Sequence, residues 1–235
     1  MLLHGGGLSW WNYRKEAEML CDRYRVVLPV LDGHADSDAG FAGIEENAGR
    51  IISFIDGEYG GSVLMIGGLS LGAQILTEML SQRENICRYA VIESASVIPS
   101  KMTGLLIGPA LAPTYGLIQK KWFAKMQSGY LRIPDDLFED YYRDTCKIGK
   151  EDMIAFLKAN TEYEAKPGLQ NCRVQARIAV GKKEPEKMIR SAKRLHEMLP
   201  GSRIEIKDGL YHGEYSINHP EQYVKELLLM FQDNN

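Results

Sequence analysis

The sequence has few cysteines, and they are widely separated. The four cysteines among its 235 residues are Cys21, Cys87, Cys146 and Cys172, and none belongs to a CxxC pair. Disulfide frameworks and zinc sites use closely spaced cysteines, whereas isolated thiols are typical of reduced side chains packed in a core. We therefore expect neither a disulfide-stapled domain nor a metal centre.

The sequence also lacks a large charge of one sign and a long apolar run. Its formal net charge is -3 at pH 7, which provides no basic surface for nucleic acid. The longest uncharged stretch, MTGLLIGPALAPTYGLIQ from Met102, contains glycines and prolines that argue against a membrane span. The first residues show no secretory signal, so we expect a cytoplasmic, soluble protein that acts on a small molecule.

Apolar β-rich runs alternate with amphipathic runs along most of the chain. The expected strands are Met1 to His4, Arg25 to Val30, Ser62 to Ile66, Tyr89 to Glu93, Gln175 to Val180 and Arg203 to Ile206. The expected helices are Trp11 to Asp22, Ile44 to Tyr59, Leu71 to Gln82, Glu186 to Leu199 and Pro220 to Phe231. This alternation predicts an α/β fold, with a mostly parallel central sheet flanked by helices on both faces.

Residues 94–172 interrupt this alternation, because they separate two strands by far more than an ordinary connection. Two stretches within them, DDLFEDYYRDTC and KEDMIAFLKANTEY, have helical apolar spacing. We interpret residues 94–172 as a helical cap inserted over one end of the sheet. Residues 1–93 and 173–235 would then form the core.

The stretch GLSLG, from Gly68 to Gly72, joins a predicted strand to a predicted helix. In a G-x-S-x-G turn the serine adopts a strained conformation that exposes its hydroxyl, and small flanking residues allow strand and helix to pack closely. Ser70 is therefore a candidate nucleophile. A glycine-rich helix cap or a phosphate-binding loop is the alternative, but the lysine or GxGxxG pattern of a phosphate loop is absent.

A serine nucleophile needs a histidine as its base, and His212 has the most suitable position. It follows the last predicted strand, and ligands of open α/β sheets bind beside loops of this kind. The other histidines have structural interpretations in turns, in a helix or at a helix start: His4, His34, His196 and His219. A solvated loop residue is the alternative interpretation of His212.

The histidine in turn needs an acidic partner, and Glu184 follows directly after the penultimate predicted strand. Glu186, two residues later, follows Pro185 and is interpreted as the start of a helix. The order nucleophile, acid, base is then Ser70, Glu184, His212. Glu93, at the end of another predicted strand, is the next candidate for the acid.

The stretch LHGGGLSWW places three glycines directly after the first strand, where unobstructed backbone amides can stabilise an oxyanion. We assign this role to the amide of Gly6, together with the amide of Leu71, the residue after the candidate nucleophile.

With these parts in this order, the sequence resembles the α/β-hydrolase superfamily over nearly its whole length. LHGGGLSWWNYRKEAEMLCDRYRVVLPVLDGHADSD resembles the family's run from the oxyanion turn, GLSLG its nucleophile elbow, and HGEYSINHPEQYVKELLLMF its histidine loop and closing helix. The resemblance implies nucleophile, base and oxyanion roles for Ser70, His212, Gly6 and Leu71, and a structural turn role for His34. The chain departs from the family by carrying Glu184 where aspartate is commoner, and by showing no antiparallel hairpin before the first strand.

The implied function is that of a serine esterase without a cofactor, acting on short to medium acyl esters through an acyl-enzyme. Apolar residues of the cap would line the acyl pocket, with Trp10 and Trp11 beside the oxyanion turn: Leu105 to Ile118, Trp122, Phe123 and Met126. The alternative is that each of these apolar residues packs in the core and does not contact a ligand. Thioester, amide or carbon–carbon cleavage, lyase chemistry, or ligand binding on an inactive scaffold remain alternatives. A homodimer is left open.

Overall fold

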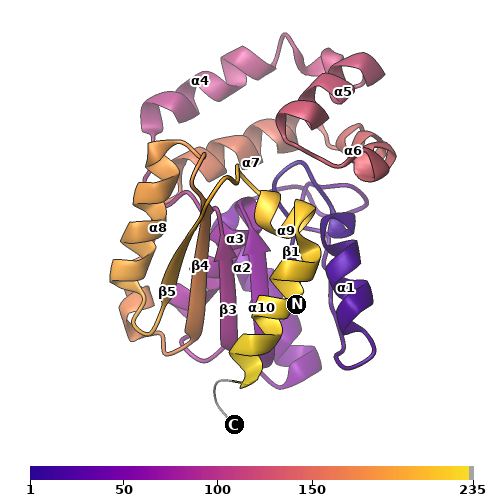
Figure 1. The fold of residues 1–235 in the computed structure, drawn as a ribbon. Helices are drawn as coiled ribbons and strands as arrows, with labels where there is room; N and C mark the ends of the chain where they lie inside the picture. Colours follow the sequence, from indigo (N-terminus) through magenta and orange to yellow (C-terminus); the bar gives the residue numbers. More distant parts are fainter. Residues whose placement is uncertain (233–235) are drawn as a thin grey trace.

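A computed structural model describes residues 1–232 and has a five-stranded sheet at its centre (Figure 1). The strands are β1 (Leu2–Leu3), β2 (Val63–Leu69), β3 (Cys87–Glu93), β4 (Gln175–Gly181) and β5 (Arg203–Lys207). They lie in the order β1-β2-β3-β4-β5, and each pairs with its neighbours in parallel. The α/β fold with a parallel sheet, predicted from the sequence, is confirmed.

Helices occupy the connections between the strands. The α-helices are α1 (Arg14–Leu20), α2 (Ile44–Tyr59), α3 (Leu71–Gln82), α4 (Lys101–Leu111), α5 (Lys121–Tyr130), α6 (Phe138–Thr145), α7 (Lys150–Glu162), α8 (Glu186–Met198), α9 (Glu214–Asn218) and α10 (Pro220–Gln232). Short 3-10 helices lie at Trp10–Tyr13, Tyr115–Leu117, Asp135–Leu137 and Pro167–Asn171. Within residues 1–232, none of these helices has the length and apolar character that crossing a membrane requires.

Both faces of the sheet are covered, because alternate residues of each strand point to opposite sides. Leu2 and Met65 pack in one cluster with residues of α1, α9 and α10. Leu3 and Ile66 pack in a second cluster, with residues of α2, α3 and α8. In the view of Figure 1, α10 lies in front of the sheet and α2 and α3 lie behind it.

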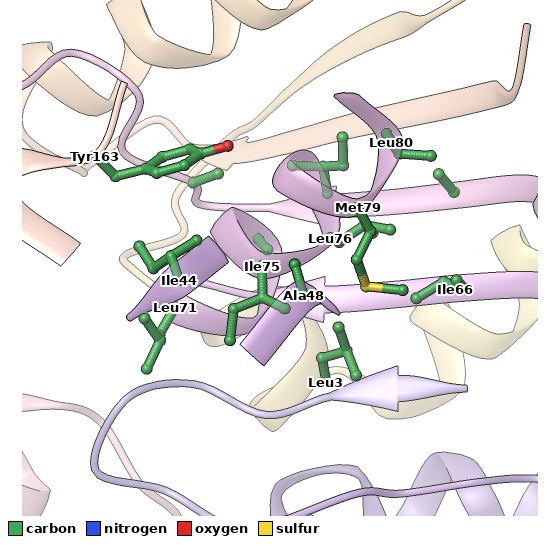
Figure 2. Packing of buried hydrophobic residues seen from close by; sticks show 14 of the residues in the cluster. Leu3, Ile44, Ala48, Ile66, Leu71, Ile75, Leu76, Met79, Leu80 and Tyr163 are labelled. Atoms are coloured by element: carbon green, nitrogen blue, oxygen red, sulfur yellow. The ribbon is translucent and has the colours of Figure 1, made fainter. Parts of the chain in front are cut away.

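Helix α3 is the most deeply buried helix of this second cluster. Every residue from Leu71 to Leu80 is buried, as expected for a helix that is apolar on nearly all sides. Its side chains Ile75 and Met79 lie among residues of α2, β1 and β2, including Ala48 and Ile66 (Figure 2). The residue that precedes this helix is therefore held by the centre of the core.

The predicted strand at Arg25 to Val30 is wrong, because this segment forms no ladder with the sheet. The N–H of Leu2 donates one hydrogen bond of 3.0 Å to the carbonyl oxygen of Val27. Pro29 lacks the N–H that a continued ladder would use, so the segment runs beside β1 as irregular chain.

Residues between β3 and β4 form α4 to α7, and these helices gather at the end of the sheet toward which the strands run (Figure 1). The two stretches with helical spacing are helical: the first contains Asp135–Leu137 and α6, and the second contains α7. Helix α7 also joins the core of the sheet, since Met153 and Phe156 are buried in the cluster of α2 and α3.

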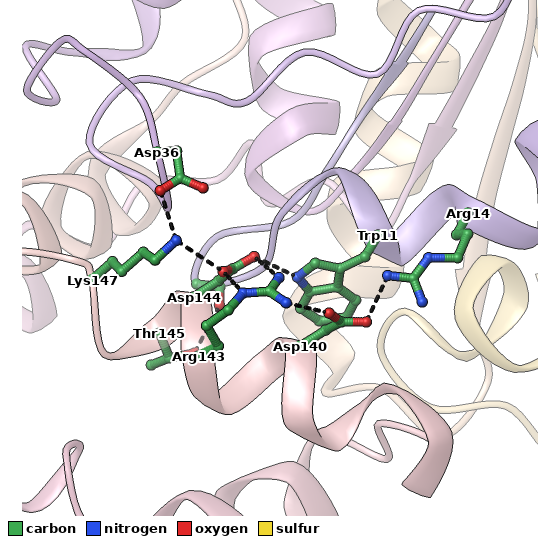
Figure 3. Close-up of polar contacts among 9 residues, drawn as sticks. Trp11, Arg14, Asp36, Asp140, Arg143, Asp144, Thr145 and Lys147 are labelled. Atoms are coloured by element: carbon green, nitrogen blue, oxygen red, sulfur yellow. Dashed lines mark hydrogen bonds and ion pairs between the residues drawn. The ribbon is translucent and has the colours of Figure 1, made fainter.

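Polar contacts attach α6 to the turn after β1 (Figure 3). The indole N–H of Trp11 donates to Asp144 Oδ2 at 3.0 Å, and Arg14 pairs with Asp140 at 2.6 Å. The Thr145 hydroxyl donates to the carbonyl oxygen of Gly7 at 3.2 Å. Residues 94–172 are therefore bonded to the same glycine turn that the sequence predicts to bind an oxyanion.

The glycines of the G-x-S-x-G turn are required by close backbone packing. A Cβ atom on Gly72 would overlap the carbonyl oxygen of Leu3 in β1. A Cβ atom on Gly68 would lie 2.5 Å from the carbonyl oxygen of Gly72. Because these obstacles are backbone atoms, a side-chain rearrangement cannot relieve them.

We expect Gly72→Ala to reduce the free energy of unfolding by about 3 kcal/mol or more, because α3 must move away from β1. Gly57→Ala is the matched control, since Gly57 lies in α2 and an added Cβ meets no atom within 4 Å. It should raise stability by up to about 1 kcal/mol through helix propensity. Urea denaturation measures both, and equal stability of the two variants would contradict the packing argument.

Candidate active site

Ser70 lies between β2 and α3 in a backbone conformation that non-glycine residues rarely adopt. Its φ is 52° and its ψ is −109°. The strained turn that the G-x-S-x-G pattern predicts is therefore present. Its N–H donates to the carbonyl oxygen of Glu93 at 2.9 Å, so the end of β3 holds the turn in place.

His212 and Glu184 come from separate loops and meet directly. His212 lies between β5 and α9, Glu184 follows β4, and His212 Nδ1 lies 2.7 Å from Glu184 Oε2. The Glu184 side chain is fully buried, whereas that of His212 is 42% exposed. The carboxylate thus lies inside the protein, with the imidazole between it and solvent. Glu186 begins α8, as predicted.

The other oxygen of the Glu184 carboxylate is also bonded. Glu184 Oε1 accepts hydrogen bonds of 2.7 Å from the Ser94 hydroxyl and from the N–H of Gly181. Burial raises the pKa of Glu184, but hydrogen bonds and the nearby His212 charge outweigh it and lower the pKa below its usual value. This carboxyl is therefore ionised at neutral pH.

The Glu184 carboxylate fixes both the protonation and the orientation of His212. Burial lowers the pKa of His212, but the hydrogen bond and charge of Glu184 and the charge of Glu93 raise it above the usual value. Since a carboxylate accepts, Nδ1 carries the hydrogen of the neutral ring. Nε2 is then left with a lone pair, which is what a general base requires.

Two of the remaining histidines are buried and neutral. Leu31 donates its N–H to Nε2 of His4, and burial lowers the pKa of His4 to about 3. Burial also lowers the pKa of His34 to about 4, and its Nδ1 lies 2.9 Å from the carbonyl oxygen of Asp32. Both rings hold turns together, as the sequence suggests. His196 Nδ1 contacts the Ser202 hydroxyl, and His219 is exposed before α10.

Gly6 and Leu71, whose amides are the predicted oxyanion donors, lie in neighbouring segments. A Cβ on Gly6 would lie 3.5 Å from the Cβ of Leu71 and 3.1 Å from the ring of Phe156. Leu71 is the first residue of α3, so its N–H has no acceptor within the helix. Phe156, from α7, covers the glycine turn.

The predicted pocket residues differ in exposure. Trp11 is 1% exposed and bonded to Asp144, so its ring packs in the core and presents no surface to a ligand. Trp10 is 39% exposed beside the Arg14 guanidinium. On α5, Trp122 and Met126 are exposed, while Phe123 is partly buried against the core.

Sequence reasoning missed Ser94, which completes the bonding of Glu184. Ser94 directly follows β3 and has a φ of 55°, a second strained position at the same end of the sheet. A polar residue after a buried strand was the available signal, but its partner lies 90 positions later. Glu93, the alternative acid, accepts from the N–H of Ser216 at 3.2 Å, and the bond to Nδ1 of His212 comes from Glu184.

A protein-family model matches nearly the whole chain. The family model described as "Alpha/beta hydrolase family" matches residues 1–226. The protein belongs to the α/β-hydrolase family, which confirms the resemblance stated above. A search of curated protein sequences found no match.

Solved structures with the same fold include several enzymes. An esterase from Exiguobacterium antarcticum is 18% identical with a TM-score of 0.80, covering 98% of this chain and 91% of that one. The enol-lactonase from Burkholderia xenovorans is 15% identical with a TM-score of 0.80, covering 98% and 90%. A meta-cleavage product hydrolase from Pseudomonas fluorescens is 14% identical with a TM-score of 0.73, covering 100% and 90%. At these identities the similarity establishes the fold.

We expect Glu184→Gln to lower the pKa of His212, because the substitution keeps the shape of the carboxyl and removes its charge. The imidazole titration followed by NMR measures this pKa directly. The wild-type value should lie above that of a free histidine.

Glu186→Gln is the control for this titration. It removes the same charge two residues away, where Glu186 is exposed at the start of α8. The His212 pKa should not move in this variant. Equal shifts in both variants would show that a general field, rather than the bond at 2.7 Å, sets the pKa.

Proposed function

We propose that the protein is a serine hydrolase, a carboxylesterase in which Ser70 is the nucleophile, His212 the base and Glu184 the acid. The observation that carries this proposal is the buried Glu184 carboxylate bonded to His212 Nδ1 at 2.7 Å. The strained Ser70 turn at the same end of the sheet supplies the third member. Few structural roles require a charged carboxylate, an imidazole and a strained serine together.

In the first half-reaction, His212 Nε2 takes the proton of Ser70 as its oxygen attacks the ester carbonyl. The amides of Gly6 and Leu71 stabilise the oxyanion that forms. When the tetrahedral intermediate collapses, the alcohol leaves with the proton from His212, and the acyl group stays on Ser70. Glu184 remains ionised and stabilises the imidazolium.

In the second half-reaction, water replaces the alcohol. His212 takes a proton from the water, the resulting oxygen attacks the acyl-enzyme, and the same amides bind the second oxyanion. The proton then returns to Ser70 as the acid leaves. With its side chain 42% exposed, His212 is accessible to the water that this step consumes.

The choice of an ester rests on the chemistry of the site and on analogy. The structural neighbours named above include an esterase, an enol-lactonase and a meta-cleavage product hydrolase, so the fold alone does not select the bond that is cleaved. A neutral base and two amide donors suit an activated carbonyl such as an ester or lactone.

We further propose that apolar residues of α4 and α5 bind the acyl group. Leu105, Leu106, Trp122 and Met126 are between 58% and 65% exposed, which is unusual for large apolar side chains. They belong to the segment that gathers at the end of the sheet where Ser70 lies (Figure 1). A surface of this kind suits short to medium acyl chains.

We expect Ser70→Ala to lower kcat for p-nitrophenyl butyrate by about three orders of magnitude or more, because binding and oxyanion stabilisation alone remain. Removing the hydroxyl should leave the fold intact, as circular dichroism would show. Near-normal esterase activity in this variant would falsify the proposed function.

A fluorophosphonate probe distinguishes an enzyme from a binding protein on the same scaffold, because it labels activated serines only. Labelling should occur on wild-type protein and be absent from Ser70→Ala. Ser81, a helix residue whose hydroxyl donates to the carbonyl oxygen of Glu78, supplies the control position. Ser81→Ala should label at the wild-type rate.

We expect Trp122→Ala to raise KM for p-nitrophenyl octanoate by about three- to tenfold and leave KM for the acetate unchanged, because the longer chain loses apolar contact. Leu64→Ala is the matched control, since Leu64 is an exposed apolar residue at 43% on β2. Leu64→Ala should change neither the KM for p-nitrophenyl octanoate nor the KM for the acetate. Equal changes for acetate and octanoate in Trp122→Ala would argue against an acyl pocket on α5.

A further inference from the structure

The carboxyl of Glu93 is buried at the end of β3, and its bonding is incomplete. The residue is 1% exposed. Its Oε1 accepts the N–H of Ser216 at 3.2 Å, whereas Oε2 has no hydrogen-bond partner among residues 1–232. A buried polar atom without a partner costs stability, so its presence calls for a reason other than packing.

The groups around the Glu93 carboxyl add to the cost of burying its charged form. It faces Tyr13 from the first 3-10 helix, Glu16 from α1, Glu184 after β4, and Tyr223 from α10. Burial is the main cause that raises the pKa of Glu93 to about 7, contact with Ser216 opposes it, and the charge of Glu184 adds to it. The nearby His212 also favours the charged form of Glu93.

Glu93 and its neighbour contact all three segments that carry the proposed triad. The carbonyl oxygen of Glu93 accepts the N–H of Ser70 at 2.9 Å. Its carboxyl accepts the N–H of Ser216, four residues after His212 and in the first turn of α9. The hydroxyl of Ser94 donates to Glu184 at 2.7 Å.

We infer that Glu93 is a positioning residue, whose carboxyl holds α9 and the His212 loop against β3 while its backbone holds Ser70. Strand β3 lies in the middle of the sheet, paired on both sides, so it is a rigid reference for both segments. One residue thus contacts both the serine turn and the helix that follows the histidine loop. This inference rests on the proposed function.

If Glu93 is a positioning residue, its substitution should affect the rate of turnover more than the stability of the fold. Replacing Glu93 by leucine removes the cost of burying a carboxyl but leaves the buried N–H of Ser216 without its acceptor, so the two effects on stability oppose each other. A residue retained only for packing would therefore lose little rate in that exchange. A positioning residue would lose rate, because a small displacement of a catalytic base is enough to slow the reaction.

The test compares Glu93→Leu with Glu93→Gln in kcat, KM and thermal stability, using p-nitrophenyl butyrate. Glu93→Leu removes the acceptor of the Ser216 N–H, so kcat should fall by about 10- to 100-fold with KM within about twofold. Its melting temperature should stay within about 5 °C of the wild type, because removing the buried carboxyl offsets the N–H left without an acceptor. Glu93→Gln keeps an acceptor oxygen and should restore kcat to within about threefold of the wild type.

A second variant removes the same hydrogen bond from the other side. Ser216→Pro has no N–H to donate, and proline is tolerated in the first turn of a helix. Its kcat should fall as in Glu93→Leu, which keeps the inference testable if one variant does not fold. Wild-type kcat in a folded Glu93→Leu or Ser216→Pro protein would overturn it. Equal losses in the Leu and Gln variants would also overturn it, because Gln retains the acceptor.

Ser70→Ala, measured in the same assay, separates the two proposals. Activity that survives in Ser70→Ala refutes the proposed function itself. Activity that vanishes in Ser70→Ala but persists in Glu93→Leu leaves the serine hydrolase proposal standing and refutes the positioning role of Glu93.

Discussion

The close contact between α3 and the backbone of β1 is the constraint on which the site depends. Gly68 and Gly72 permit it, since a side chain at either position would meet backbone atoms. With the helix this close to the sheet, the connecting residue has no room for an ordinary turn, and Ser70 takes a φ of 52°. The burial of α3 from Leu71 to Leu80 stabilises the structure enough to maintain that strain.

The parallel sheet then brings distant residues together. The ends of β3 and β4 lie side by side, so Glu93 and Ser94 meet the loop of Glu184, and the loop after β5 brings His212 to the same edge. Both carboxyls are buried, and their hydrogen bonds separate their protonation states. Glu184, with three hydrogen bonds, is ionised, whereas Glu93, whose Oε2 has no partner within residues 1–232, has a pKa of about 7.

Local patterns predicted the elements well and their side-chain partners less well. The bounds of α2 and α3 were predicted to the residue, because apolar spacing and flanking glycines mark them. The segment at 25–30 has the composition of a strand. Whether Pro29 interrupts its ladder depends on which residues pair with β1, and composition does not report pairing. Ser94 and Trp11 depend on partners 90 and 133 positions away, beyond the reach of any local pattern.

The bond between Trp11 and Asp144 limits how such a chain can diversify. The indole bonds to a residue of α6, and that helix is also held to α1 by the ion pair between Arg14 and Asp140 and to the glycine turn by the Thr145 hydroxyl (Figure 3). Exchanging residues 94–172 for an unrelated segment would remove Asp144 and expose the apolar indole ring to water. Such an exchange would therefore reduce stability in the core as well as change the outer helices. Substitutions of the exposed residues on the outer helices α4 and α5 leave this bond intact.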